Sequence, residues 1–289
     1  MALSLLAALI ALGLLHLLPQ LAQWRGDGVF RGWVRQLDDT AGRGRVLLTL
    51  IVPTVLCLLL AELLGQVPLG GFLQLAFAVL VLLYALGPHA FEADLEAILR
   101  APDAVSRHTA AQRLAEPGGQ VAWSAHALGE AVAIAALRRR FGVLLWFFLL
   151  GPAGALLYRL AQTLGRDDTL ALDAGSRTHA RFVANALDWL PAQLLVFTLA
   201  LVGHWDAVMA AWQRWRLHAA PTSWYTDGPD FLAAAACADI DVEIDAGDGY
   251  AEERTDPLLE LTRMRSAFLR ALLAWLSIVA LIVLGGWVT

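Results

Sequence analysis

The chain has 289 residues, of which 58% are hydrophobic and 16% charged, and its formal net charge at pH 7 is −5. Soluble domains average about 45–50% apolar and about 25% charged residues, and here the apolar residues cluster in runs, so we predict an integral membrane protein. All 21 basic residues are arginine, which excludes a P-loop lysine, a Schiff-base lysine and a lysine general base. No basic face is interleaved with aromatic residues, so we expect no nucleic-acid partner.

Six apolar segments are long enough to span or enter a bilayer. They are Ala2–Leu18, Val46–Leu64, Phe72–Leu86, Phe141–Leu164, Leu187–Gly203 and Ala267–Val288. The first has neither a preceding basic residue nor a following cleavage site, so we interpret it as a short span and not as a signal peptide. The predicted fold is all-α: a polytopic membrane protein with about five or six membrane segments and a small cytoplasmic helical layer, in a single domain over residues 1–289.

The loop Gln20–Arg45 carries five arginines, and the positive-inside rule therefore places it in the cytoplasm. Trp24, Phe30 and Trp33 in this loop suggest an interfacial helix, although we prefer an ordinary amphipathic loop. The next two apolar segments form a helical hairpin with an external turn.

The apolar segment Phe141–Leu164 is interrupted by Gly151-Pro152-Ala153-Gly154. Broken helices occur in membrane proteins where neighbouring helices shield the freed backbone groups. If the segment crosses the membrane, the arginines of the connection that follows lie outside, against the charge rule; if it enters and returns, they stay inside. The sequence leaves both possibilities open. These arginines are Arg159, Arg166, Arg177 and Arg181.

Two polar segments separate the apolar ones, a cytoplasmic segment at 89–140 and an acidic segment at 204–266. In the first, we predict helices over Phe91–Leu99, Ala104–Leu114 and Val121–Arg140, with Asp103 as the cap of the second. In the second, the tryptophans Trp205, Trp212, Trp215 and Trp224 are typical of a headgroup interface.

The stretch Asp239–Asp245 alternates acidic and apolar residues, which predicts a solvated loop or a short strand. Continued to Glu252, it approaches the pattern of a calcium loop, but Ala246 stands where that loop needs glycine. The seven histidines form no HxxH or HExxH pair. We therefore expect no metal and no cofactor.

Charged residues in or beside the central apolar segments are the candidate ligand-binding residues, because a charge is costly there and tends to have a role or a partner. Glu130, Arg159 and Asp188 indicate either a ligand site or an internal ion pair, and Asp188 also fits a helix cap before Pro191. Arg138, Arg139 and Arg140 either fix the cytoplasmic side or bind an anion. Trp189 follows Asp188 directly and completes the candidate set. No catalytic residue is assigned.

The run Leu144–Arg159, with Leu-Trp-Phe-Phe-Leu-Leu-Gly-Pro-Ala-Gly at its centre, and the stretch Ala186–Ala192 followed by Gly203-His204, resemble the CobD/CbiB superfamily. Within it the pattern looks most like the AmpE proteins, inner-membrane proteins linked to β-lactamase induction. The resemblance covers Glu130–His204 best. CobD/CbiB proteins are cobalamin-pathway synthases that attach an aminopropanol unit to a corrinoid carboxylate.

The sequence departs from the synthase pattern at several polar positions. Ala133–Gly142 replaces the Glu-Asn and Asp of Glu-x-x-x-Glu-Asn-x-x-Asp-Gly, while Gln162 and Gly165 stand for the Asn and Asp of Tyr-Arg-x-x-Asn-Thr-Leu-Asp. A fold alone does not confer function. The resemblance therefore implies a non-enzymatic regulatory or sensor protein of the bacterial inner membrane, modulating β-lactamase induction and cell-wall recycling. Its partners would be the lipid bilayer and a peptidoglycan-derived ligand or another membrane protein. The alternative is a divergent ATP-dependent synthase of the CobD/CbiB kind.

Overall fold

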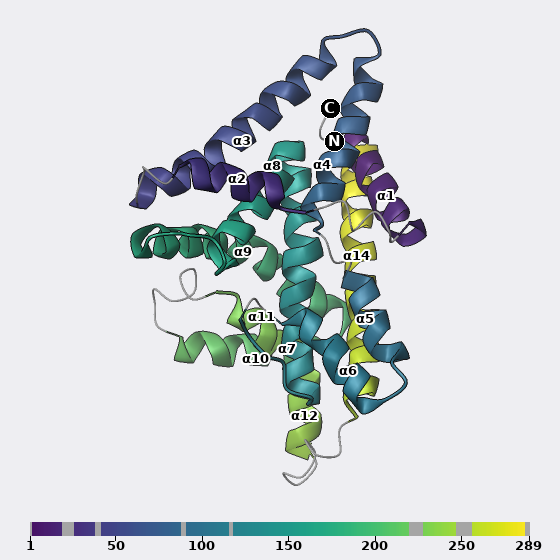
Figure 1. The fold of residues 1–289 in the computed structure, drawn as a ribbon. Coiled ribbons are helices and arrows are strands. Elements are labelled where there is room, and N and C mark those ends of the chain that lie inside the picture. The colour runs from purple at the N-terminus through teal and green to yellow at the C-terminus, as the bar shows by residue number, and fades with distance from the viewer. Residues whose placement is uncertain are drawn as a thin grey trace. The chain divides into compact units, whose positions relative to one another are not determined.

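The computed structural model describes residues 2–18, 26–37, 42–87, 91–115, 118–219, 228–246 and 256–286, and over these ranges it contains helices and no strand (Figure 1). The predicted all-α class is confirmed. Four stretches of the described chain are long and apolar enough to cross a membrane: α3 (Gly42–Gly65), the continuous run Ala125–Arg166, α9 (Ala174–Val202) and α14 (Pro257–Leu284). Two shorter apolar helices are α1 (Ala2–Leu17) and α4 (Gly70–Ala85). The protein is therefore a multi-pass membrane protein whose helices contact the lipid bilayer.

The chain forms two compact units. The first comprises Met1–Ala90, Gly142–Leu187 and Leu276–Thr289, and the second comprises Phe91–Phe141 and Asp188–Trp275. Both α9 and α14 therefore begin in one unit and end in the other.

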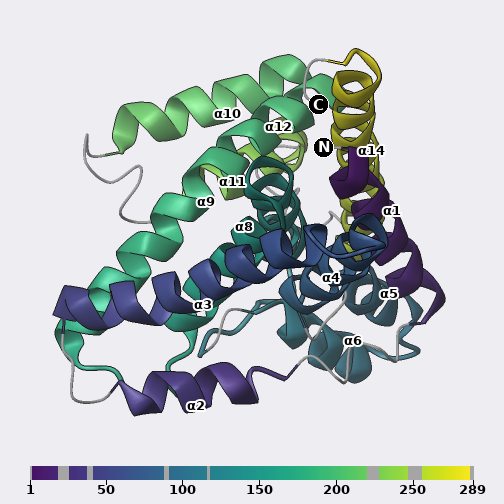
Figure 2. The same ribbon diagram turned by 90° about the horizontal axis from the view of Figure 1, so that it is seen from above.

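The first unit is built on α4, which contacts α1, α3 and α8 (Gly142–Arg166) (Figure 2). Its surface and interior are arranged for a lipid solvent. On α3 the side chains of Arg45 and Thr49 are buried, whereas many of its leucines are exposed. Hydrocarbon covers apolar surface as well as a protein core does, so the polar side chains turn inward, where backbone groups can accept their hydrogen bonds.

The predicted break in α8 is confirmed at Gly151, whose φ of 66° and ψ of −156° are open essentially to glycine alone. The chain then doubles back. A Cβ on Gly142 would overlap the Tyr158 ring, and a Cβ on Gly154 would overlap the backbone oxygen of Trp146. In a straight helix, Gly142 and Tyr158 would be about 24 Å apart.

These contacts make α8 a helical hairpin that turns back at Gly151. Each contacting pair is symmetric about residue 150, at the break. Within α8 the entering arm, Gly142–Leu150, rises about 13 Å, and it continues α7 and the π-helical segment without a gap. The close packing at Gly142 and Gly154 is possible because glycine lets two helical backbones approach.

Return of the chain places the arginine-bearing connection against the loop that precedes α3. Arg31 forms an ion pair with Asp167 at 2.8 Å, and the Ser176 hydroxyl donates to the carbonyl oxygen of Gly42 at 3.2 Å. The Arg45 guanidinium donates to the carbonyl oxygen of Ala171. The two connections therefore lie side by side in the first unit, with their arginines gathered together, an arrangement that agrees with the positive-inside rule.

The same loop contains a helix, α2 (Gly28–Gln36), so our preferred loop interpretation is wrong. Phe30 and Val34, one turn apart, are buried in a cluster with residues of α3 and α8, while the intervening Arg31 points to Asp167. An apolar pair at i, i+4 with charges between is the pattern of a surface helix. Trp24 lies outside the described residues.

The second unit contains the polar helices and the adjoining ends of α9 and α14. Its own helices are α5 (Phe91–Arg100), α6 (Ala104–Ala111), α7 (Ala125–Ala136), α10 (Trp205–His218), α11 (Asp230–Ala236) and α12 (Ala238–Ala246), with a 3₁₀ turn at Gln112–Leu114 and a π-helical segment at Leu137–Phe141. The first two predicted helices are confirmed, and Asp103 caps α6 by accepting from the Ser106 amide. The third begins four residues later than predicted, because Ser124 caps it.

The acidic stretch after Cys237 is α12 and not the predicted loop or strand. In a helix, residues two apart point to opposite sides, so Asp239 and Asp241 do not converge as they would in a calcium loop. Gly247, Asp248 and Glu252 of that pattern lie outside the described residues, as does Trp224. Among the described residues, no three histidine, cysteine or acidic side chains group as metal ligands.

Candidate functional site

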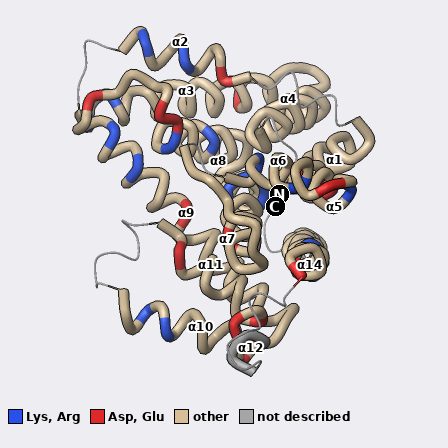
Figure 3. Tube along the Cα trace, turned by 60° about the horizontal axis from the view of Figure 1, so that its bottom comes forward, with Lys and Arg blue, Asp and Glu red and all other residues tan. Residues whose placement is uncertain are grey.

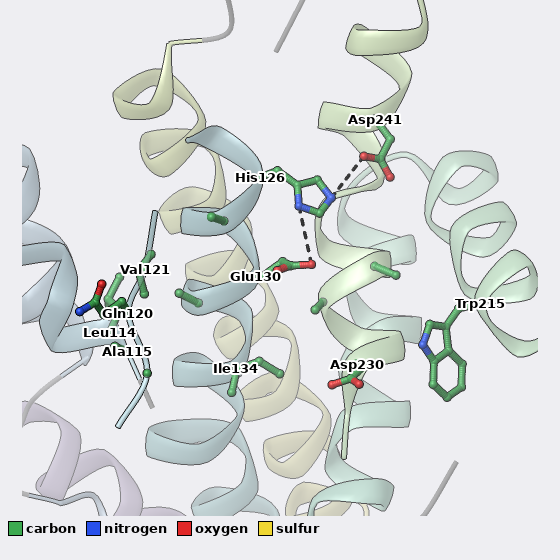
Figure 4. Close-up of a pocket in the computed structure, with 15 residues that line it drawn as sticks. Leu114, Ala115, Gln120, Val121, His126, Glu130, Ile134, Trp215, Asp230 and Asp241 are labelled. Atoms are coloured by element: carbon green, nitrogen blue, oxygen red, sulfur yellow. Dashed lines mark ion pairs between the residues drawn. The ribbon is translucent and has the colours of Figure 1, made fainter. Parts of the chain in front are cut away.

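A histidine held between two carboxylates marks the candidate site in the second unit. His126 and Glu130 lie one turn apart on α7, and the His126 Nδ1 is 3.6 Å from the Glu130 carboxylate (Figure 4). Asp241 reaches the other ring nitrogen, Nε2, from α12 at 3.5 Å. Both ring nitrogens of His126 therefore face carboxylate oxygens, which can accept a hydrogen bond from a ring N–H.

These three residues line an open cavity of about 630 Å³. Its wall is mostly apolar, and it includes Trp215 from α10 and Asp230 from the start of α11. Figure 3 marks the positions of acidic residues along α11 and α12 in red on the Cα trace. Among its described lining residues, the cavity thus offers three carboxylates, one imidazole, one indole and no arginine. Such a lining favours a small cationic ligand, for which the indole adds a cation–π surface.

Cys237 packs against α7, the helix that carries His126 and Glu130. Its thiol is fully buried, and its Sγ lies 3.6 Å from the carbonyl oxygen of His126. Burial raises the pKa of this thiol, and the neighbouring Glu130 and Asp241 raise it further. The group stays protonated at neutral pH and is therefore a packing residue against Gly129, not a nucleophile.

Only Glu130 of the cavity was among the predicted candidates. The i, i+4 spacing of His126 and Glu130 on a helix was a usable signal for their proximity. Nothing local in the sequence connects them to Trp215, Asp230 and Asp241, which approach because α10, α11 and α12 pack together and α11 packs on α7.

The three consecutive arginines each bind a different acceptor. Arg138 pairs with Asp188 at 3.1 Å, Arg139 with Asp94 at 2.7 Å, and Arg140 with Glu92 at 2.6 Å. The π-helical segment Leu137–Phe141 carries them. These pairs support the internal ion-pair interpretation of Arg138 and Asp188. Since α9 begins at Ala174, Asp188 is fully buried inside that helix, and the predicted cap is wrong.

Arg159 belongs to the first unit, where it pairs with Asp27 at 2.9 Å. The Tyr84 hydroxyl donates to the same carboxylate at 3.3 Å. Trp189 is half-buried beside Asp188 on α9. The seven candidates therefore fall into three places: Glu130 in the cavity, Arg159 in the first unit, and the other five in the π-helical segment and the adjoining part of α9.

The returning arm of α8 carries Gln162 and Gly165, two positions that depart from the synthase pattern of the sequence analysis. Gln162 is buried, and its amide donates to the carbonyl oxygen of Ala184. Arg166 donates to the side-chain oxygens of both Gln162 and Asn185, at 2.9 and 2.7 Å. Gly165 packs directly on Ala180, where a Cβ would be too close to the backbone. Gln162, Gly165 and Arg166 of α8 thus all contact residues of α9.

Comparisons with known proteins give one relative to report. Over 114 residues the chain is 38% identical to the cobalamin biosynthesis protein CobD of Chromobacterium violaceum. The matched region covers 38% of this chain and 34% of that protein, so it spans about a third of the relative's length. No family model matches the chain, and no solved structure matches it. The similarity supports the predicted relationship to the CobD/CbiB superfamily.

Proposed function

We propose that the protein is a membrane-bound synthase of the CobD/CbiB kind that acts in the biosynthesis of cobalamin or a related corrinoid. The cavity around His126, Glu130 and Asp241 would hold the amine substrate. The main support for this proposal is the acidic lining of the cavity, in a chain similar to a cobalamin biosynthesis protein. This revises the preference for a non-enzymatic role.

The chemistry of amide formation fits the residues of the cavity. An amino alcohol arrives at neutral pH as an ammonium ion, which the carboxylates of Glu130 and Asp241 attract. It must lose a proton before its nitrogen can attack a carboxylate that ATP has activated as an acyl phosphate, and phosphate leaves as the amide bond forms. His126 lies between the two carboxylates and is the residue placed to accept that proton. The acidic lining repels phosphates, so the cavity suits the amine and not a nucleotide.

Binding of 1-amino-2-propanol to the purified protein in detergent tests this assignment. The amine should bind, whereas 1,2-propanediol, which has a hydroxyl in place of the ammonium, should not. Glu130→Gln and Asp241→Asn should each weaken amine binding about tenfold, as expected for loss of one charge-assisted contact. Glu96→Gln, a half-exposed acidic residue on α5, is the matched control. Equal binding of the diol and the amine would refute the site.

A deletion strain tests the pathway independently of the site. Cells that depend on corrinoid made from a precursor should stop growing when the gene is removed, and added cobalamin should restore growth. Growth without cobalamin after deletion would exclude a required role in this pathway.

A regulatory membrane protein of the AmpE kind is the second candidate. It is favoured by the replaced synthase positions, because Arg138–Arg140 and Gln162 are used in internal contacts of the two units. This candidate would reside in the bacterial inner membrane and respond to a peptidoglycan-derived ligand or to another membrane protein. Deletion should then change β-lactamase activity after inducer challenge, and Glu130→Ala should fail to restore it at normal membrane levels. Unchanged induction would remove this candidate.

A further inference from the structure

A second cavity of the second unit, about 430 Å³, lies among the ends of α9, α12 and α14. Its wall is apolar, with Leu199 and Val202 from α9, Ile240 from α12, and Met264 and Phe268 from α14. None of these side chains belongs to the acidic cavity described above. The pocket therefore needs its own explanation.

Charged side chains line the pocket beside this apolar wall. Glu260 and Arg263 neutralise each other at 2.7 Å. Asp239 has His204 as its neighbour, with Oδ1 and Nδ1 3.0 Å apart. Arg270 forms no hydrogen bond or ion pair with any described residue. The pocket therefore offers a ligand one guanidinium, on Arg270, and one carboxylate, on Asp239, which has a second oxygen besides the Oδ1 that faces His204.

The pocket lies at the ends of two apolar segments, where the sequence predicts a membrane boundary. The Trp275 indole donates to the Thr198 hydroxyl at 2.9 Å, which fixes the last turns of α9 beside α14. The apolar run of α9 ends at Val202, and α14 carries no charged residue after Arg270. Trp205, half exposed at the start of α10, is of the type that lies at the headgroup level.

We propose that this pocket binds the zwitterionic headgroup of phosphatidylethanolamine. Arg270 would bind the phosphate, since a guanidinium fork matches phosphate oxygens. Asp239 would accept hydrogen bonds from the ammonium group. The apolar wall formed by α9 and α14 would cover the upper part of an acyl chain. This inference does not depend on the proposed function.

Charge balance distinguishes this occupant from other membrane lipids. An anionic phosphatidylglycerol headgroup satisfies Arg270 but meets the Asp239 carboxylate with no positive group. A phosphatidylcholine headgroup has the right charges, but its quaternary ammonium has no N–H to donate. Only a primary ammonium with a phosphate satisfies both side chains.

Lipid binding to the detergent-purified, delipidated full chain tests the proposal by native mass spectrometry. Phosphatidylethanolamine, phosphatidylglycerol and phosphatidylcholine of identical acyl chains are titrated separately. We expect the first to bind about tenfold more tightly than the other two. Arg270→Gln should lower its affinity about tenfold, and Asp239→Asn should abolish the preference over phosphatidylglycerol. Arg100→Gln, an exposed arginine of α5, is the control and should change nothing.

Two results would overturn the proposal. One is equal binding of the three lipids by the unmodified protein, or unchanged binding by Arg270→Gln at an unchanged unfolding temperature. The other is displacement of the lipid by equimolar free phosphoethanolamine, which would identify a site for a soluble molecule.

Discussion

The Arg138 guanidinium donates through Nε to Asp188 Oδ2 at 3.1 Å, and the Asp188 side chain is completely buried. The pair joins the π-helical segment after α7 to the middle of α9. It lies in the second unit, where Arg139 and Arg140 make parallel connections to α5 through Asp94 and Glu92. The three adjacent arginines thus connect the π-helical segment to two helices, Arg138 to α9 and the other two to α5.

Removing one partner of this buried pair should strongly destabilise the protein. Asp188→Leu leaves the Arg138 charge without its main counterion, and such a loss costs about 3–5 kcal/mol. The thermal unfolding temperature in detergent should fall sharply. The double variant Arg138→Met/Asp188→Leu should recover part of it, because no unpaired charge remains.

The exposed pair Glu96–Arg100 on α5 gives the control, since surface pairs contribute about 0–1 kcal/mol. A single Asp188→Leu protein that melts like the unmodified protein would contradict a structural role. Activity tests on Asp188 variants therefore require a measured membrane level.

Gly151→Ala should disrupt the hairpin of α8. Gly151 has φ 66° and ψ −156°, a conformation that costs a residue with a Cβ about 1–3 kcal/mol. We expect a lower unfolding temperature and faster proteolysis. Gly13→Ala in α1 is the matched control, because nothing lies within 4 Å of its Cβ and alanine favours helix. Equal stability of the two variants would show that the break does not require glycine.

The sequence predicted which segments are helical better than it predicted how those helices turn and pack. The Gly151–Gly154 break was visible because glycine and proline interrupt helices, but the return of the chain depends on the packing of Gly142 against Tyr158, which no local pattern reveals. The sequence Asp188 followed by Pro191 fits the pattern of a helix N-terminus, so a cap was predicted there. The helix in fact continues through Pro191, as membrane helices tolerate when neighbours shield the freed carbonyl.

The candidate site was predictable only in part for a similar reason. Charge in an apolar setting singled out Asp188, with an internal ion pair as one interpretation, but its pairing with Arg138 joins segments 50 residues apart. Asp241 lies more than 100 residues from His126 and reaches it through helix packing alone. The periodicity of apolar residues shows which face of a helix is buried, but it does not show which other helix packs against that face.

Acid should weaken the start of α6. Hydrogen bonds from the Ser106 amide and hydroxyl hold the pKa of Asp103 below its ordinary value of 3.8. Because the folded pKa is lower than the unfolded one, the charged cap stabilises the helix above the unfolded pKa. This contribution disappears as the pH falls through the lowered folded value.

Amide hydrogen exchange along α6 measures this effect. At neutral pH, Asp103→Ala should exchange faster than the unmodified protein, and the difference should vanish in strong acid. Asp103→Asn keeps a capping oxygen without the titration and should change little with pH. A difference that persists unchanged in acid would contradict the role of the charge.

The return of α8 also predicts which face of the membrane the arginine-rich connection occupies. Thr178, exposed on the first turns of α9, follows the segment that pairs with α2 and so lies on the side of the Gln20–Arg45 loop, in the cytoplasm by the charge rule. Ser176 is fully buried and would not report, whereas Gln66, exposed in the turn after α3, lies one full span away on the other side. Single cysteines at Thr178 and Gln66 can be probed with a membrane-impermeant thiol reagent, because Cys57 and Cys237 are both buried.

In intact bacterial spheroplasts the Gln66→Cys protein should react, and the Thr178→Cys protein should react only after permeabilisation. Reaction of both without permeabilisation would mean that α8 crosses the membrane, and the hairpin would have to be abandoned.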